Sequence, residues 1–79
     1  MAEVPRELAE KWAREDEEAR RVRREMADWK FIESQPARFK AALICYIEYG
    51  DLYLAARIAG LSIDEFDDLR WKANIPKSP

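Results

Sequence analysis

The sequence contains no histidine, one cysteine and two glycines. Without histidine, the most common general acid or base and the most common metal ligand are absent. The lone Cys45 cannot form an intramolecular disulfide, and with no histidine to activate it we interpret it as a small buried hydrophobic residue. No phosphate-binding loop, no metal-ligand cluster and no nucleophile beside a base occurs. We therefore expect a protein that is not an enzyme and that uses no metal and no cofactor.

Long apolar runs are missing too. No stretch reaches the roughly 18 apolar residues of a membrane span, and no charged-then-apolar segment opens the chain. Charge of one sign does not dominate either, because 14 Lys and Arg face 16 Asp and Glu, for a net charge of -2. The chain as a whole therefore has no strong attraction to nucleic acid or anionic lipid. We expect a cytoplasmic protein that does not contact membranes.

What is present favours helices. Of the 79 residues, 48% are hydrophobic and 38% are charged, which is typical of an ordered, charge-rich chain. We predict an all-α fold, with a long N-terminal amphipathic helix followed by a three-helix unit. A chain this short buries only about 60% of its extended surface. A homo-oligomer, most simply a dimer, is therefore expected.

The first predicted region, residues 1–33, is a long charged helix that begins at Pro5 and continues to about Ile32 without glycine or a second proline. Acidic residues precede basic ones by four positions, which supports a helix. These pairs are Glu7/Lys11, Glu10/Arg14, Asp16/Arg20 and Glu17/Arg21. The predicted role of this region is oligomerisation or binding of a partner.

Apolar residues recur along this helix at spacings of four and three, as in a heptad repeat. We call them the seam: Leu8, Trp12, Ala19, Val22, Met26 and Trp29. Glu15 interrupts the seam and Glu33 closes it. Such a stripe suits a coiled-coil partner or a second copy, and it equally suits packing on the rest of the chain. A lipid-facing helix is the least favoured reading, because the polar face is as acidic as it is basic.

A dense basic cluster follows the acidic run 15–18 and comprises Arg20, Arg21, Arg23 and Arg24. One interpretation is a solvated helix face laced with salt bridges. The other is an arginine surface that grips an acidic site or a phosphate on a partner.

Pro36 separates this region from a second one, residues 36–76, for which we predict three helices. The first, 36–49, is apolar on so many sides that it should be the central helix of the core. Gly50 ends it, and the next helix covers 51–59.

The turn that follows contains Gly60 and Leu61. Ser62 and Glu65 then form an S-x-x-E capping box that opens a last helix, which extends to about Ala73. A small Ala56 lies four residues before the turn glycine, where two crossing helices would touch. These features predict a helix-turn-helix over residues 51–73.

In a helix-turn-helix that reads DNA, the exposed face of the second helix enters the major groove. The candidate DNA-facing residues are Ser62, Ile63, Asp67, Arg70, Trp71 and Lys72, and Arg57 is a further basic residue within reach of phosphates. Asp64, Asp67 and Asp68 put carboxylates on this face, where they meet the phosphate charge. We therefore expect weak DNA binding at most, with no strong sequence preference.

A family resemblance lies in the second region, over about residues 38–76. The residues that carry it are Tyr49-Gly50-Asp51, Ala55-Ala56-Arg57-Ile58-Ala59-Gly60-Leu61-Ser62, Glu65-Phe66, Leu69 and Asn74-Ile75-Pro76. The stretch resembles small VapB-type antitoxins, common in archaea, with the pattern A-A-x-x-A-G-(L/M)-S-x-x-E-F and a closing I-P. The resemblance implies an antitoxin that pairs with a magnesium-dependent PIN-domain ribonuclease and regulates its own operon. The N-terminal helix lies outside it.

Two functions follow as hypotheses. In the first, an antitoxin-like protein neutralises such a toxin, with the four clustered arginines forked onto the carboxylates that hold the toxin's magnesium ion. Val22 and Met26 would then anchor the helix in a groove of the toxin. In the second, the chain is a homodimeric structural or adaptor protein whose helix-turn-helix has no role on DNA.

Overall fold

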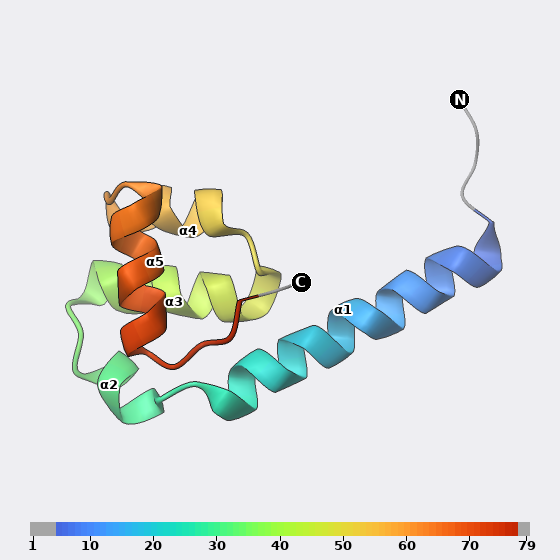
Figure 1. Cartoon of the computed structure of the whole chain (residues 1–79), viewed down its shortest axis with the longest axis horizontal. Coiled ribbons are helices and arrows are strands. Elements are labelled where there is room, and N and C mark those ends of the chain that lie inside the picture. The colour runs from blue at the N-terminus through green and yellow to red at the C-terminus, as the bar shows by residue number, and fades with distance from the viewer. Residues whose placement is uncertain (1–4, 78–79) are drawn as a thin grey trace.

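A short helix interrupts the path between the long N-terminal helix and the central helix of the fold (Figure 1). The computed structural model describes residues 5–77, so the ends of the chain, including the first four residues of the predicted region 1–33, lie outside it. Within that span there are five helices and no strand, which confirms the predicted all-α class. The helices are α1 (Arg6–Met26), α2 (Trp29–Glu33), α3 (Ala37–Tyr49), α4 (Leu52–Ala59) and α5 (Ile63–Lys72).

The predicted continuous helix from Pro5 to about Ile32 is wrong. The helical conformation stops at Met26, and Ala27 adopts an extended conformation with φ -61° and ψ 140°. Asp28 then starts α2 by accepting a hydrogen bond from the backbone N–H of Phe31 at 3.0 Å. Trp29 consequently belongs to α2, and the seam on α1 ends at Met26.

The break after Met26 is stabilised by the far end of the chain. In an uninterrupted helix the carbonyl of Met26 would accept from the amide four residues later. Here it accepts a hydrogen bond from the side-chain amide of Asn74 at 2.9 Å. The N–H of Asp28 donates to the carbonyl of Ala73 at 2.8 Å. The segment after α5 thus supplies partners that the helix would otherwise have supplied.

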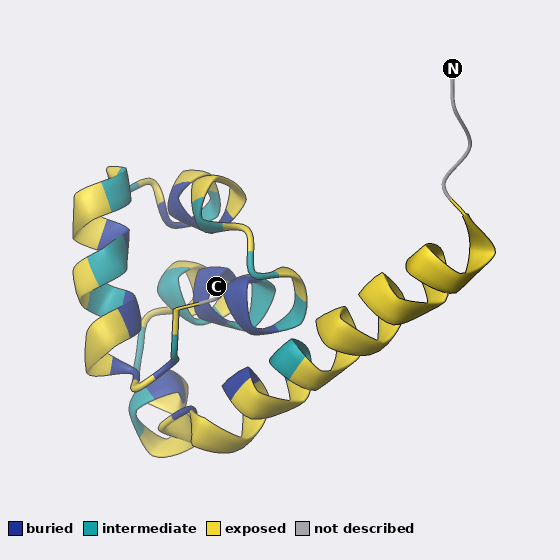
Figure 2. Cartoon of the chain, turned by 45° about the vertical axis from the view of Figure 1, so that its right-hand side comes forward, coloured by how far each residue is buried: buried dark blue, intermediate teal, exposed yellow. Residues whose placement is uncertain are grey.

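Helix α3 is the centre of the core, as predicted, and it contacts α1, α2 and α4, whereas α5 packs on α4. Four of its residues are buried, Ala42, Leu43, Tyr46 and Ile47. The Tyr46 ring lies 6.0 Å from that of Phe66 on α5, tilted by 56°. Figure 2 shows the buried residues concentrated on the facing sides of these helices, whereas most of α1 is exposed.

The turns around α4 follow the predicted chemistry. Gly50 and Gly60 both adopt left-handed conformations, with φ 64° and 71°, and end α3 and α4. Ser62 and Glu65 form both hydrogen bonds of the capping box at the start of α5. Ala56 is 2% exposed where α4 meets its neighbours. The sequence therefore predicted this part of the chain to within about one residue.

Candidate partner-binding surface

The N-terminal half of α1 is a free helical arm. Every residue from 5 to 18 is exposed, and α1 extends away from the other four helices (Figures 1 and 2). Its seam does not pack on the rest of the chain, because Leu8, Trp12, Val22 and Met26 keep between 36% and 50% of their surface in solvent. Ala19 is half-buried. The alternative in which the seam lies on its own chain is therefore not the one that the fold adopts.

The C-terminal half of α1 is anchored through arginines to the end of α3. Arg23 Nε donates to the carbonyl of Ile47 at 2.9 Å, and Arg20 Nε donates to the carbonyl of Glu48 at 2.9 Å. The last carbonyls of a helix lack partners within the helix and carry partial negative charge, so guanidinium groups suit them. Arg24 adds an ion pair with the Glu48 carboxylate, with 2.8 Å between Nη2 and Oε1.

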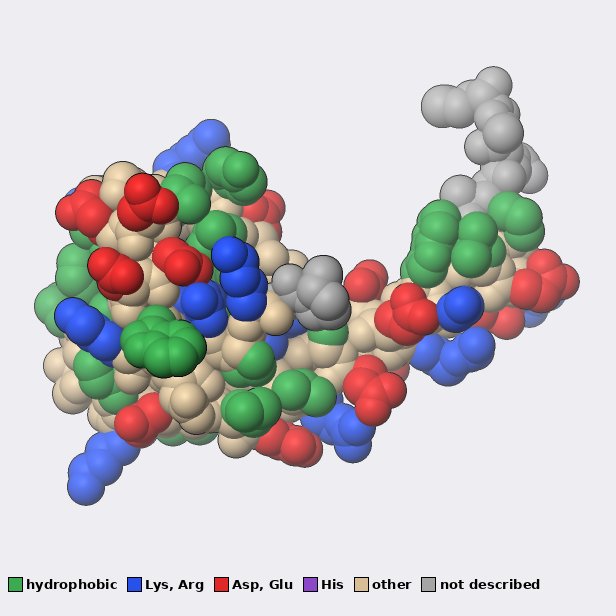
Figure 3. Space-filling view, in the orientation of Figure 1, with side chains coloured by type: hydrophobic (Ala, Val, Ile, Leu, Met, Phe, Trp, Pro, Cys, Tyr) green, Lys and Arg blue, Asp and Glu red, His purple; other side chains and the backbone are tan. Residues whose placement is uncertain are grey.

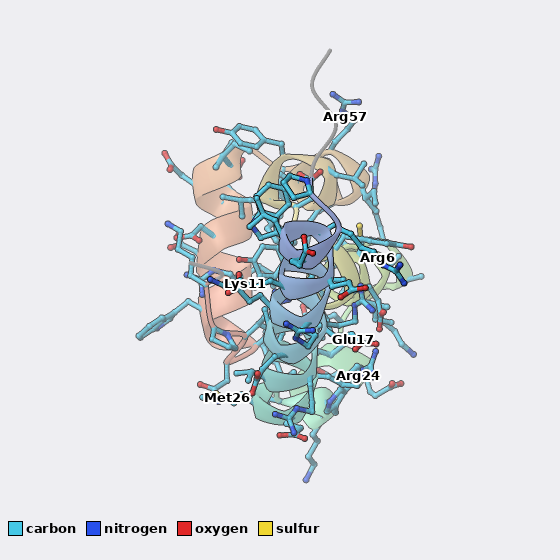
Figure 4. The ribbon with its side chains drawn as sticks, turned by 90° about the vertical axis from the view of Figure 1, so that its right-hand side faces the viewer. Arg6, Lys11, Glu17, Arg24, Met26 and Arg57 are labelled. Carbon is cyan, nitrogen blue, oxygen red and sulfur yellow. The ribbon has the colours of Figure 1, made fainter. Side chains whose placement is uncertain are left out.

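This arrangement corrects the prediction that all four arginines face a partner. Arg23 is 6% exposed, and its guanidinium lies inside the protein. Arg21 stays on the surface, where Nη2 lies 3.0 Å from Oε1 of Glu18. The Arg24 side chain is 53% exposed despite its ion pair. Figure 4 shows Arg24 on the same side of α1 as Arg6 and Glu17, away from Met26 and Lys11.

A groove of about 320 Å³ runs between α1 and the segment after α5. Its lining surface is mainly apolar. The residues that line it are Glu15, Glu18, Ala19, Val22, Arg23, Pro76 and Lys77. The groove therefore lies on the seam side of α1, where the arm leaves the body of the protein.

The outer face of α5 is acidic. Asp64, Glu65 and Asp68 are exposed, and acidic side chains gather over this helix in Figure 3. Trp71 is 76% exposed on the same helix. Ser62 and Lys72 are exposed as well, whereas Ile63 and Asp67 are half-buried.

Arg70 is not the phosphate-facing residue that the sequence predicted. It is 7% exposed, donates from Nε to Asp67 Oδ1 at 2.9 Å, and donates from Nη1 to the carbonyl of Ile75 at 2.7 Å. A buried arginine whose donors are used in this way holds the C-terminal segment against α5. The candidate DNA-facing residues include two basic ones, Arg70 and Lys72, and of these Lys72 is exposed.

Hydrogen bonds shift the acidity of two carboxyl groups on α5. The capping hydrogen bonds with Ser62 lower the pKa of Glu65, and the hydrogen bond from Arg70 lowers the pKa of Asp67. Burial, together with the nearby charge of Asp51, raises the pKa of the Cys45 thiol. Cys45 is only partly buried, so the prediction that it is a buried residue is only partly correct.

Over residues 5–77, no three His, Cys, Asp or Glu side chains are grouped so that they would hold a metal ion. Within the same residues, no helix combines the length and apolar character needed to cross a bilayer.

Comparisons with protein-family models, with curated protein sequences and with solved structures find no match to this chain. Inferences about function therefore depend on the surfaces described above and on the sequence pattern of residues 38–76.

The sequence did not predict several residues that join distant parts of the fold. Asn74 and Asp28 hold the junction between α1 and α2, and Arg38 Nε donates to the carbonyl of Ile58 at 3.0 Å at the end of α4. The spacing of Arg20, Arg23 and Arg24 put them on one helix face, which is a usable signal for a shared contact. The helix end that they cap cannot be read from spacing alone.

Proposed function

We propose that this chain is a non-enzymatic, antitoxin-like binding protein that neutralises a PIN-type ribonuclease through α1. The observation that carries the proposal is the free arm, in which residues 5–18 are all exposed on a helix anchored only at its C-terminal half. A helix that projects from a small folded unit suits recognition in a groove of a partner protein. The resemblance of residues 38–76 to VapB-type antitoxins supplies the class of that partner.

Two of the four clustered arginines remain candidates for the contact with the nuclease. Arg21 and Arg24 are the members of the cluster with more than half of their side chains in solvent, at 61% and 53%. Their ion pairs with Glu18 and Glu48 are surface pairs, which are weak and can be exchanged for a partner's carboxylates. A guanidinium forked onto the carboxylates of a nuclease site would compete with the magnesium ion and prevent activation of water.

The outer face of α5 is poorly suited to bind DNA and so to regulate an operon, because it carries Asp64 and Asp68 while Arg70 is buried. This observation favours the alternative function, a homodimeric adaptor whose helix pair α4–α5 serves packing alone. The two functions differ in whether a nuclease is bound.

The test is inhibition of the PIN-type ribonuclease whose reading frame adjoins the gene for this chain. Purified nuclease is assayed on a fluorogenic RNA with magnesium, with and without the native chain. We expect inhibition by the native chain and at least a tenfold weaker effect from the variant with Arg21→Gln and Arg24→Gln. The matched control is Arg57→Gln, which removes an exposed arginine on α4, remote from the anchored part of α1 (Figure 4).

Equal inhibition by the double variant would exclude the arginine contact while retaining the antitoxin function. An absent nuclease reading frame, or no inhibition by the native chain, would favour the adaptor.

A further inference from the structure

The free face of α1 has a self-complementary pattern. We infer that two copies of this chain pair their arms in antiparallel orientation, so that Leu8 of each arm enters the groove of the other. In the same register, Lys11 of each arm pairs with Glu18 of the second copy. This inference concerns the seam, and it does not depend on the nuclease partner or on the arginine face.

The seam and the groove lie on one side of the helix and are available together. Ala19 and Val22 belong to both. The anchoring residues Arg20, Arg23 and Arg24 are directed at α3 and leave the seam open. Lys11 and Met26 lie on this open side in Figure 4, opposite Glu17 and Arg24. A second helix can therefore lie on the seam without disturbing the anchor.

The spacing of the seam defines the register. In a two-fold symmetric contact, if residue i meets residue j, then j also meets i. An axis between Trp12 and Glu15 places Leu8 against Ala19 of the second copy. The small Ala19 leaves room for Leu8 at the groove, where Val22 and Pro76 complete an apolar pocket. Trp12 then packs on the aliphatic stem of Glu15, whose carboxylate reaches solvent.

Charge selects this register over its competitors. Residues that flank an apolar seam set the orientation of paired helices. The antiparallel register pairs Lys11 with Glu18 twice. A parallel pair would set Glu15 against Glu15 of the second copy, and an antiparallel pair shifted so that Trp12 faces Val22 would set Glu18 against Glu18. Like charges placed opposite each other disfavour both alternatives.

The first test is a charge exchange measured by sedimentation equilibrium. Lys11→Glu and Glu18→Lys should each weaken the dimer at least about tenfold, because each creates two like-charge contacts. The double variant should restore the native dissociation constant to within about threefold. Lys11 and Glu18 are about 10 Å apart along one helix, so the rescue has to act between chains. Glu17→Lys, which makes the same charge change on the opposite side of α1, should leave dimerisation unchanged.

The second test fixes the orientation by disulfide trapping in a Cys45→Ser background. Chains with Leu8→Cys are mixed with chains carrying Ala19→Cys and oxidised, and circular dichroism verifies that all variants keep their helices. The antiparallel register predicts cross-links between the two variants and few within either. Cross-links within each variant would indicate a parallel pair and overturn the inference. A native chain that is monomeric at 100 micromolar, or a double charge variant that fails to recover, would overturn it as well.

Discussion

Asn74 and Met26, 48 positions apart in the sequence, are joined by a hydrogen bond of 2.9 Å from the Asn74 side-chain amide to the Met26 carbonyl. Asn74 is also the one residue other than glycine with a positive φ, 57°, among residues 5–77. Asparagine tolerates this conformation better than most residues. Asn74 therefore has two roles. Its side chain donates to the last carbonyl of α1, and its backbone turns the chain after α5.

Replacing Asn74 should weaken the fold through both roles. Asn74→Ala removes the hydrogen bond and puts a residue that tolerates the left-handed region less well than asparagine at a positive φ, with an expected loss of about 2 kcal/mol in the free energy of unfolding. Asn74→Gly removes only the hydrogen bond, so we expect about half that loss. Chemical denaturation of both variants measures the difference. Equal losses would mean that the backbone conformation contributes nothing.

Arg23 should be the strongest anchor of α1. Arg23→Met keeps much of the stem but leaves the carbonyl of Ile47 without the guanidinium, at an expected cost of about 2 kcal/mol. Arg21→Met removes only an exposed ion pair with Glu18 and should cost less than about 1 kcal/mol. Urea denaturation gives the free energies. Hydrogen exchange of α1 amides gives a second measurement, in which Arg23→Met alone should increase exchange. Similar values for the two variants would contradict this anchoring role.

Acid should destabilise the helix α5. The hydrogen bond from Arg70 lowers the pKa of Asp67 in the folded chain, whereas in the unfolded chain this pKa has its ordinary value of about 4. The contact therefore stabilises the fold above that value, and the stabilisation is lost as the pH falls through the lowered folded pKa. We expect Asp67→Asn to reduce the melting temperature at neutral pH, and the difference from the native chain to shrink as the pH falls through the lowered pKa of Asp67.

The matched control for this prediction is Glu65→Gln. Glutamine can still accept the capping hydrogen bond from the backbone of Ser62, so its effect at neutral pH should be smaller. A constant difference between Asp67→Asn and the native chain at every pH would refute the assigned role of ionisation.

DNA should bind weakly to the native chain because of the acidic face of α5. Changing both Asp64 and Asp68 to Asn should raise non-specific affinity severalfold at low salt, since it removes repulsion from phosphates. Fluorescence anisotropy with a labelled random duplex measures this change. Glu7→Gln with Glu10→Gln on the arm is a control with the same change in net charge. Nanomolar, sequence-selective binding by the native chain would overturn the prediction.

Local signals explain how much of the fold the sequence predicted. Gly50, Gly60 and the Ser62/Glu65 capping box act within a few residues, so their effects can be read from spacing. The break after Met26 carries no glycine or proline, and it depends on Asn74 and Ala73 from the other end of the chain. Only Asp28, a good N-cap residue, was a local sign of it.

The sequence also predicted only part of the candidate surface. The seam residues from Leu8 to Met26 follow a simple period, and Leu8, Trp12, Val22 and Met26 stay exposed, so they remain available for contacts with a partner. The division of the arginine cluster into a buried anchor and exposed members was not predictable, because it depends on where the last turn of α3 lies relative to α1. Arg70 was misplaced for the same reason, since its partner is the carbonyl of Ile75 after the helix.

Arg20 and Arg23 hold backbone oxygens of α3, which every residue type possesses. The attachment therefore tolerates exchange of the Glu48 side chain, whereas the two arginines have no substitute among shorter residues. Homologous chains would be expected to drift in sequence at the end of α3 while keeping the arm in place.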